Sequence, residues 1–114
     1  AGDTTRVTLL YTNKEQSDII ARSTLEAWAA AYPDRLRLVH TLTREPLESN
    51  WQGRRGRIDE ALLRAHVPPP SADVLIFVCG PPAMYDTLSG GRAEKKLSGA
   101  LAGMGYRASQ VVKF

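Results

Sequence analysis

The feature that most constrains the fold is a continuous apolar run, Val74–Val78, that stops abruptly at Cys79-Gly80-Pro81-Pro82. A strand without polar alternation is typical of a parallel sheet whose two faces are both covered. Directly after it, a glycine allows a flat ligand to approach the backbone, and the prolines fix the turn. The run is much shorter than a membrane span. It therefore predicts a buried strand that leads into a rigid turn.

The remaining segments alternate between strand and helix patterns. Strand composition occurs at 7–12, 36–43 and 110–114, and a polar loop occupies 44–57. Helix patterns occur at 58–63, at 92–104 before Gly105, and after an expected N-cap at Ser17. The helix after Ser17 would carry four residues on one helical face: Ala21, Leu25, Trp28 and Tyr32. The alternation predicts the α/β class, with an open, mostly parallel Rossmann-like sheet, right-handed crossovers and helices on both faces.

Length and composition fit one domain, 1–114. The chain has 114 residues, 43% hydrophobic residues and a net charge of +3, which together suit a soluble globular domain. Its one cysteine, Cys79, excludes an internal disulfide framework and a cysteine-based zinc cage. We therefore expect no metal site.

Three strand ends carry the polar groups that a ligand would need. In open parallel sheets, ligands bind outside the carboxyl ends of the strands. Those ends are Thr12-Asn13-Lys14, Thr43-Arg44 and Cys79–Pro82, and the loop after the second end adds Arg54, Arg55 and Arg57. Their convergence predicts a site for a phosphate-bearing ligand, although the chain has no G-x-G-x-x-G or Walker-type loop.

Nucleophilic catalysis has no support in the sequence. No basic partner can be assigned to Cys79, and single cysteines are commonly buried small hydrophobes. His40 and His66 lack a carboxylate or serine at a recognisable spacing, so structural or solvent-facing roles are favoured for both.

Several motifs follow one another along the chain: Tyr11-Thr12-Asn13, Thr41-Leu42-Thr43-Arg44, Trp51, Gly56, His66-Val67-Pro68-Pro69-Pro70, Cys79–Met84 and Phe114. In this order they resemble the nicotinamide-nucleotide-binding domain of the NADH-cytochrome b5 reductases, within the ferredoxin-NADP reductase superfamily. The stretch Cys-Gly-Pro-Pro-x-Met is specific to the superfamily, and the preceding His-x-Pro-Pro-Pro narrows the resemblance to the b5 reductase branch.

The resemblance implies a flavoenzyme mechanism, in which a hydride passes from NADH or NADPH to FAD and single electrons then pass to a haem acceptor such as cytochrome b5. It places Cys79 and Gly80 against the nicotinamide, with Cys79 as a contact and not a nucleophile. It also implies that Pro81, Pro82 and Met84 shape the turn, that Phe114 closes the nicotinamide end, and that 12–14 and 43–57 surround the adenosine half.

Three positions depart from the family pattern. Thr43 stands where an acidic residue is usual, Lys14 where glutamine is frequent, and Arg57 where an aromatic residue follows Gly56. An acidic side chain bonds the free ribose of NADH and repels the 2′-phosphate of NADPH. Its loss, together with added cations, predicts that the parent enzyme accepts NADPH. Which nucleotide it prefers is left open.

The resemblance also implies segments upstream of this stretch. These are an FAD-binding barrel and the glycine-rich first strand and helix of the nucleotide domain. We accordingly expect the 114-residue chain to be catalytically inactive alone, and open strand edges would favour its self-association. In the family the enzyme faces the cytoplasm, and an N-terminal segment can anchor it in the endoplasmic reticulum or outer mitochondrial membrane.

A small nucleotide- or nucleic-acid-binding module is the alternative interpretation. Arg44, Arg54, Arg55 and Arg57 would then follow phosphates. The modest net charge and the single interleaved aromatic, Trp51, argue against it, so we expect no nucleic-acid partner. An interaction domain of the flavodoxin-like type would carry an acidic cluster at its strand ends, which this sequence lacks.

Overall fold

The structure is a computed structural model that describes residues 4–114. The chain divides into two compact units, Ala1–Ile58 and Asp59–Phe114, and each is described here by itself.

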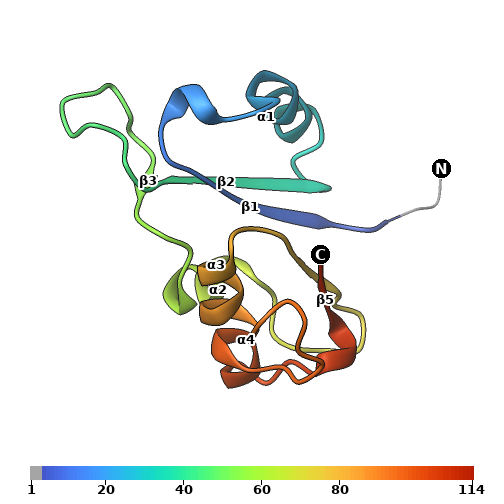
Figure 1. The fold of residues 1–114 in the computed structure, drawn as a ribbon. Coiled ribbons are helices and arrows are strands. Elements are labelled where there is room, and N and C mark those ends of the chain that lie inside the picture. Colours follow the sequence, from blue (N-terminus) through green and yellow to red (C-terminus); the bar gives the residue numbers. More distant parts are fainter. Residues whose placement is uncertain (1–3) are drawn as a thin grey trace. The chain divides into compact units, whose positions relative to one another are not determined.

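The first unit contains a three-stranded parallel sheet in the order β1-β2-β3 (Figure 1). β1 (Val7–Asn13) pairs with β2 (Leu36–Leu42) in a register that runs from Val7↔Leu36 to Asn13↔Leu42. The two-residue strand β3 (Arg54–Arg55) pairs with the end of β2. The 3-10 helix η1 (Gln16–Asp18) and the helix α1 (Arg22–Ala31) connect β1 to β2. The first two strands and the stop before Pro33 agree with the sequence pattern, whereas β3 lies in the segment expected to be a loop.

The buried face of α1 differs from the predicted one. Ser17 lies inside η1, and the residue before α1 is Ala21, whose φ of 58° is left-handed. Leu25 and Ala29 are half-buried, whereas Trp28 and Tyr32 are exposed. Leu25 belongs to two adjacent stripes with the same helical spacing, so periodicity alone chose the wrong one.

The second unit contains a two-stranded parallel sheet and three short helices. β4 (Ile76–Val78) pairs with β5 (Val111–Lys113), from Ile76↔Val111 to Val78↔Lys113. The helices are α2 (Glu60–His66), α3 (Pro82–Leu88) and α4 (Gly99–Gly103), and the 3-10 helix η2 (Ala108–Gln110) precedes β5. The α/β class and the parallel pairing of strands are thus confirmed.

The helix expected at 92–104 is wrong in extent, because only Gly99–Gly103 is helical. Gly99 has a φ of 73°, and a Cβ there would lie 2.7 Å from the Thr87 carbonyl oxygen, so this tight approach starts the helix late. The expected end is confirmed, since Gly105 follows the C-cap with a φ of 99°. α3 was not predicted, although a proline at the first helical position suits a helix start.

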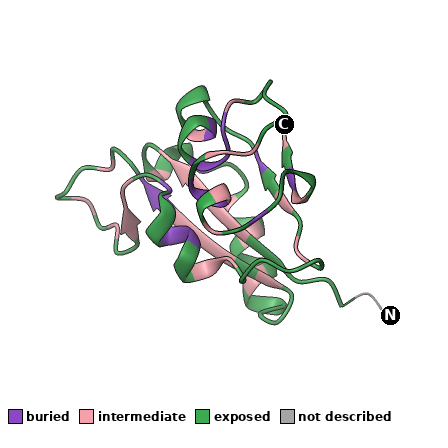
Figure 2. Cartoon of the chain, turned by 90° about the horizontal axis from the view of Figure 1, so that it is seen from below, coloured by how far each residue is buried: buried purple, intermediate pink, exposed green. Residues whose placement is uncertain are grey.

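The expectation that both faces of β4 are covered is also wrong. Val78 is buried, but Leu75 and Phe77 are exposed. Figure 2, coloured by burial, shows that exposed and half-buried segments predominate over buried ones along the chain. Residues two apart on a strand point to the same face, so one face of β4 is apolar and open in this structure.

The buried side chains lie mainly in the second unit. In the first unit the most deeply buried are Thr41 and Leu42 on β2. In the second unit they come from every helix and both strands: Leu62, Leu63, Val78, Tyr85, Leu88, Ser89, Ala100, Leu101, Tyr106 and Val111.

The described part of the chain contains neither a membrane-spanning helix nor a metal-binding cluster. Among residues 4–114, no helix has the length and apolar character needed to cross a bilayer. Within the same residues, no group of three or more His, Cys, Asp or Glu side chains could hold a metal ion.

Candidate functional site

The carboxyl ends of β1 and β2 lie side by side. Beyond the paired strands, the Thr43 N–H donates to the Asn13 carbonyl oxygen at 2.9 Å, and the Arg44 N–H donates to the Lys14 carbonyl oxygen at 2.8 Å. The parallel ladder therefore continues past both strands. It brings together two of the three strand ends that the sequence identified.

Two buried polar atoms at this edge have no hydrogen-bond partner in residues 4–114. They are Thr12 Oγ1 and Asn13 Nδ2. Buried polar atoms are nearly always hydrogen-bonded in folded proteins, because an unpaired one costs about 1–3 kcal/mol. Each is therefore a polar group whose hydrogen-bonding capacity is unused within the described residues.

The arginines of the loop divide into two groups. Arg54 Nη1 donates to Thr41 Oγ1 at 2.8 Å and to the carbonyl oxygens of Gly56 and Arg57, and Arg55 donates to the carbonyl oxygens of Glu45 and Pro46. These two guanidinium groups support the loop. Among residues 4–114, no hydrogen bond or ion pair engages the exposed side chains of three other cations: Lys14, Arg44 and Arg57.

A carboxylate and an indole hold this loop in place. Glu45 accepts hydrogen bonds from the backbone and side-chain nitrogens of Gln16, at 2.8 and 2.7 Å. Those bonds, the side-chain one above all, lower the pKa of Glu45, so the carboxylate stays ionised. Trp51 Nε1 donates to the Arg54 carbonyl oxygen at 3.0 Å. These contacts hold the loop that carries Arg44 and Arg57.

His40 lies under this loop and has no catalytic arrangement around it. Its ring is near those of Tyr11 and Trp51, with centroids 5.8 and 6.4 Å away. Both ring nitrogens are buried without a hydrogen bond in the described residues, and Glu26 Oε1 lies 3.8 Å from Nε2. Burial lowers the pKa of His40, against the opposing effect of Glu26. The residue is thus a half-buried ring whose neutral form is favoured, and no nucleophile or metal-ligand group accompanies it among the described residues.

In the second unit, the turn after β4 is shaped by close contact. Cys79 is exposed and unpaired, and Pro82 begins α3 directly after the turn. A Cβ on Gly80 would lie 2.8 Å from Met84 Cε and closer still to Sδ. Met84 therefore folds back over Gly80, and its flexible end would have to move aside for a Cβ.

Phe114 reaches the same end of β4. Its N–H donates to the Val78 carbonyl oxygen at 3.0 Å, and its ring stacks on Phe77 with centroids 5.6 Å apart. Cys79, Gly80, Met84 and Phe114 thus surround one strand end. Sequence reasoning missed Tyr85, a buried residue of α3 whose hydroxyl donates to the Phe114 backbone oxygen. The convergence of this end with those of β1 and β2 stays a prediction, because the two groups belong to different units.

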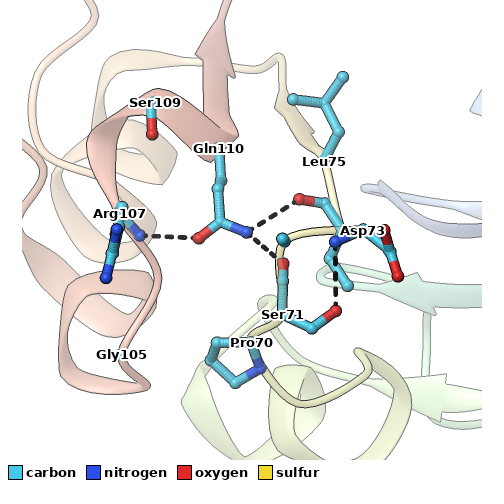
Figure 3. A pocket seen from close by; sticks show the side chains of 10 residues that line it. Pro70, Ser71, Asp73, Leu75, Gly105, Arg107, Ser109 and Gln110 are labelled. Atoms are coloured by element: carbon cyan, nitrogen blue, oxygen red, sulfur yellow. Dashed lines mark hydrogen bonds between the residues drawn. The ribbon is translucent and has the colours of Figure 1, made fainter.

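A cavity of 710 Å³ opens at the other end of β4 (Figure 3). Gln110 spans it, donating to the carbonyl oxygens of Ser71 and Val74 and accepting from the Arg107 N–H. Most of its lining residues, which come from 70–75 and 105–110, are exposed. It lies at the amino end of the strand, so it is separate from the predicted site.

Comparison with known proteins places the chain among nucleotide-binding oxidoreductases. Residues 1–89 match the model of the oxidoreductase NAD-binding domain. NADH-cytochrome b5 reductase 2 of Ajellomyces capsulatus (strain NAm1 / WU24) is 41% identical over 98% of the chain and 36% of its own length. The Debaryomyces hansenii protein of the same name is 36% identical over 98% of the chain and 38% of its own length. The resemblance to the NADH-cytochrome b5 reductases is therefore confirmed.

Solved structures agree with this result. The cytochrome b5 reductase domain of Ulva prolifera nitrate reductase superposes with a TM-score of 0.80 and 27% identity, over 99% of this chain and 39% of that one. The CS-b5R domains of human Ncb5or, in the NAD⁺ form, superpose with a TM-score of 0.74 and 27% identity, over 96% of this chain and 28% of that one. The chain thus spans little more than a third of the curated relatives it matches.

Proposed function

Because this chain belongs to the oxidoreductase NAD-binding domain family, we propose that it binds the nicotinamide dinucleotide of a flavoprotein reductase. The whole protein would pass a hydride from NADH or NADPH to FAD, and then electrons to a haem acceptor such as cytochrome b5. The observation that carries the proposal is the pair of unpartnered buried atoms, Thr12 Oγ1 and Asn13 Nδ2, at the carboxyl end of β1.

The first-unit edge would hold the adenosine half. Thr12 and Asn13 offer a hydroxyl and an amide donor, which match the acceptors and hydroxyls of an adenine nucleoside. Lys14 and Arg44 follow on adjacent backbone segments and would attract its phosphates. The unoccupied hydrogen-bonding capacity and the charge thus favour the same ligand.

The second-unit turn would hold the nicotinamide half. When bound, the nicotinamide supplies the hydride, and these residues hold its ring in position and exclude water. Gly80 exposes backbone at the turn, Pro81 and Pro82 fix its course, and Met84 packs behind it. Cys79 would contact the ring as a small apolar side chain, and Phe114 would cover its outer side.

We further propose that the site accepts NADPH. Thr43 and Arg44 follow β2, the strand next to the unpartnered atoms, and neither carries a negative charge. With Lys14 beside them, the local charge favours a 2′-phosphate, which an acidic residue at position 43 would repel.

FAD and the haem protein would be partners of segments outside these 114 residues. The relatives continue well beyond the matched stretch, which supports an FAD-binding domain in the parent protein. The chain alone would then lack flavin-dependent turnover. Its exposed apolar face around Leu75 and Phe77 supports self-association when that domain is missing.

The nucleic-acid alternative gains no support. Arg54 and Arg55, two of its four arginines, donate to backbone carbonyls inside the loop.

Titration of the isotopically labelled chain with NAD⁺, NADP⁺ and a short DNA duplex, followed by NMR, tests the proposal. We expect saturable shifts at Thr12, Asn13 and Gly80 with both dinucleotides and none with DNA. Failure of both dinucleotides to saturate at millimolar concentration would contradict it. A hundredfold preference for NAD⁺ would remove only the NADPH part.

A further inference from the structure

We propose that Tyr85 is a positioning residue, whose hydroxyl fixes the Phe114 backbone and thereby holds the Phe114 ring at the nicotinamide end of the site. This inference rests on the proposed function.

The Phe114 backbone is held on both sides. Its N–H donates to the Val78 carbonyl oxygen at 3.0 Å, and its own backbone oxygen accepts from the Tyr85 hydroxyl. The same hydroxyl lies 3.5 Å from the Val78 carbonyl oxygen. Tyr85, with 4% of its surface exposed, thus joins α3 to the last residue after β5 from inside the core.

The ring that this backbone carries is open to a ligand. Phe114 stacks on Phe77 at an interplanar angle of 30°, yet the two residues remain 54% and 60% exposed. Aromatic pairs of this kind leave free edges and faces for a further flat ring. Because Phe114 follows a short strand, its hydrogen bonds decide whether the ring has one position or several.

Consecutive residues in the first turn of α3 therefore contact both the Cys79–Gly80 turn and the Phe114 backbone. Met84 fills the space above Gly80, and the next residue, Tyr85, anchors Phe114. The Cys79–Gly80 turn and the Phe114 ring are accordingly set by the same rigid helix.

Tyr106 offers a matched control. It is likewise buried, at 5% exposed, and its hydroxyl donates to the Pro68 carbonyl oxygen, within the same unit. Tyr85→Phe and Tyr106→Phe each remove one buried hydroxyl and keep the ring. Only the first removes a contact with Phe114.

The experiment measures NAD⁺ and ADP-ribose affinity for the full chain and for Tyr85→Phe, Tyr106→Phe, Phe114→Ala and the double variant Tyr85→Phe/Phe114→Ala. Amide hydrogen exchange at Phe114 is followed in parallel. We expect Tyr85→Phe to weaken NAD⁺ binding about threefold to tenfold, as for loss of one hydrogen bond, and to leave ADP-ribose, which has no nicotinamide, unchanged. Phe114 exchange should accelerate. Tyr106→Phe should change none of these, and Tyr85→Phe should add no loss once Phe114 is alanine.

Equal weakening of NAD⁺ and ADP-ribose, unaltered Phe114 exchange, or an undiminished effect of Tyr85→Phe in the Phe114→Ala background would each overturn the inference. If the unaltered chain binds no NAD⁺, the proposed function fails together with the nicotinamide role. Phe114 exchange in Tyr85→Phe then still decides whether the anchor exists.

Discussion

Thr12 and Thr41 are register partners across β1 and β2, yet their hydroxyls differ in hydrogen bonding. Thr41 Oγ1 donates to the Gly56 carbonyl oxygen at 2.6 Å and accepts from Arg54. Thr12 Oγ1 is buried and has no partner in the described chain. Two equivalent positions on adjacent strands thus carry one hydroxyl that is bonded within the fold and one that has no hydrogen bond in residues 4–114.

Replacing each threonine by valine should give opposite results. Thr12→Val removes an unpaired hydroxyl, so the free energy of unfolding should be unchanged or higher, while dinucleotide affinity falls. Thr41→Val breaks two hydrogen bonds and should lower the free energy of unfolding by about 1–3 kcal/mol. Urea denaturation and calorimetric titration measure the two quantities. A large loss of stability in Thr12→Val would show that its hydroxyl is already bonded within the fold.

A negative charge at position 43 should change nucleotide choice. Thr43→Asp should reduce NADP⁺ affinity relative to NAD⁺ about tenfold or more, because the carboxylate would repel a 2′-phosphate and accept hydrogen bonds from a free ribose. Competition titration gives the ratio. The control is Thr24→Asp, which makes the same substitution at an exposed position of α1. A ratio that moves equally in both variants would mean that net charge, not position, is responsible.

Substitution of Arg54 and of Arg57, two arginines of the same loop, should affect stability and dinucleotide binding differently. Arg54→Ala leaves the fully buried Thr41 hydroxyl without its donor and should lower the free energy of unfolding by about 1–3 kcal/mol. Arg57→Ala removes an exposed side chain and should change stability by no more than about 0.5 kcal/mol, while weakening dinucleotide binding. Denaturation and binding measurements on both variants check this. Equal destabilisation would refute the division of the loop cations into two groups.

Acidification should destabilise the first unit through His40. Burial lowers the pKa of His40 in the folded chain, so the unfolded chain takes up a proton at higher pH. The contribution of the neutral His40 ring to the free energy of unfolding is therefore fully present above the pKa of His40 in the unfolded chain, about 6.5. It is lost as the pH falls from there toward the lower pKa of the folded chain.

Thermal melts between about pH 5.5 and 7.5 measure this effect. Four groups face the ring: Tyr11 of β1, Glu26 and Arg22 of α1, and Trp51 of the loop. His40→Phe should flatten the profile. Glu26→Gln should steepen it, because Glu26 raises the pKa. The same slope in His40→Phe as in the unaltered chain would contradict the assignment.

The contact between Gly80 and Met84 predicts a rescue. Gly80→Ala places a methyl group where the Met84 thioether lies, so the end of Met84 must take another rotamer, which should cost about 0.5–1.5 kcal/mol in stability. Met84→Ala in the same chain would vacate that space, and the double variant should be more stable than additivity allows. Denaturant melts of the four chains form the cycle. Strict additivity would show that the two residues do not compete for space.

The sequence was sufficient to predict those strands whose residue composition matches the pairing that the structure shows. β1 and β2 are rich in β-branched and apolar residues, and their alternation with helices predicted parallel pairing, which brings Asn13 and Thr43 together. β3 could not be predicted, because two arginines have no strand signature and form a strand only by pairing with Thr41 and Leu42.

Tertiary contacts explain the remaining differences. Leu97, Leu101 and Met104 have helical spacing, but the approach of Gly99 to the Thr87 backbone excludes a long helix. In the candidate site, residue types indicated phosphate binding, but only the folded structure separates Arg54, whose side chain is hydrogen-bonded within the loop, from the exposed Arg57. Tyr85 carried no sequence signal, since its role depends on where Phe114 lies.

The strand pairings also set an order in which the chain can fold during synthesis. The sheet of the first unit is complete once Arg55 has left the ribosome. β4, in contrast, pairs with β5, which is translated only after α3 and α4. Until then, the nascent chain presents β4 as a strand with unpaired backbone groups, and such edges attract chaperones or other nascent chains. Premature termination before residue 111 would therefore leave the second unit without its sheet, while the first could already be formed.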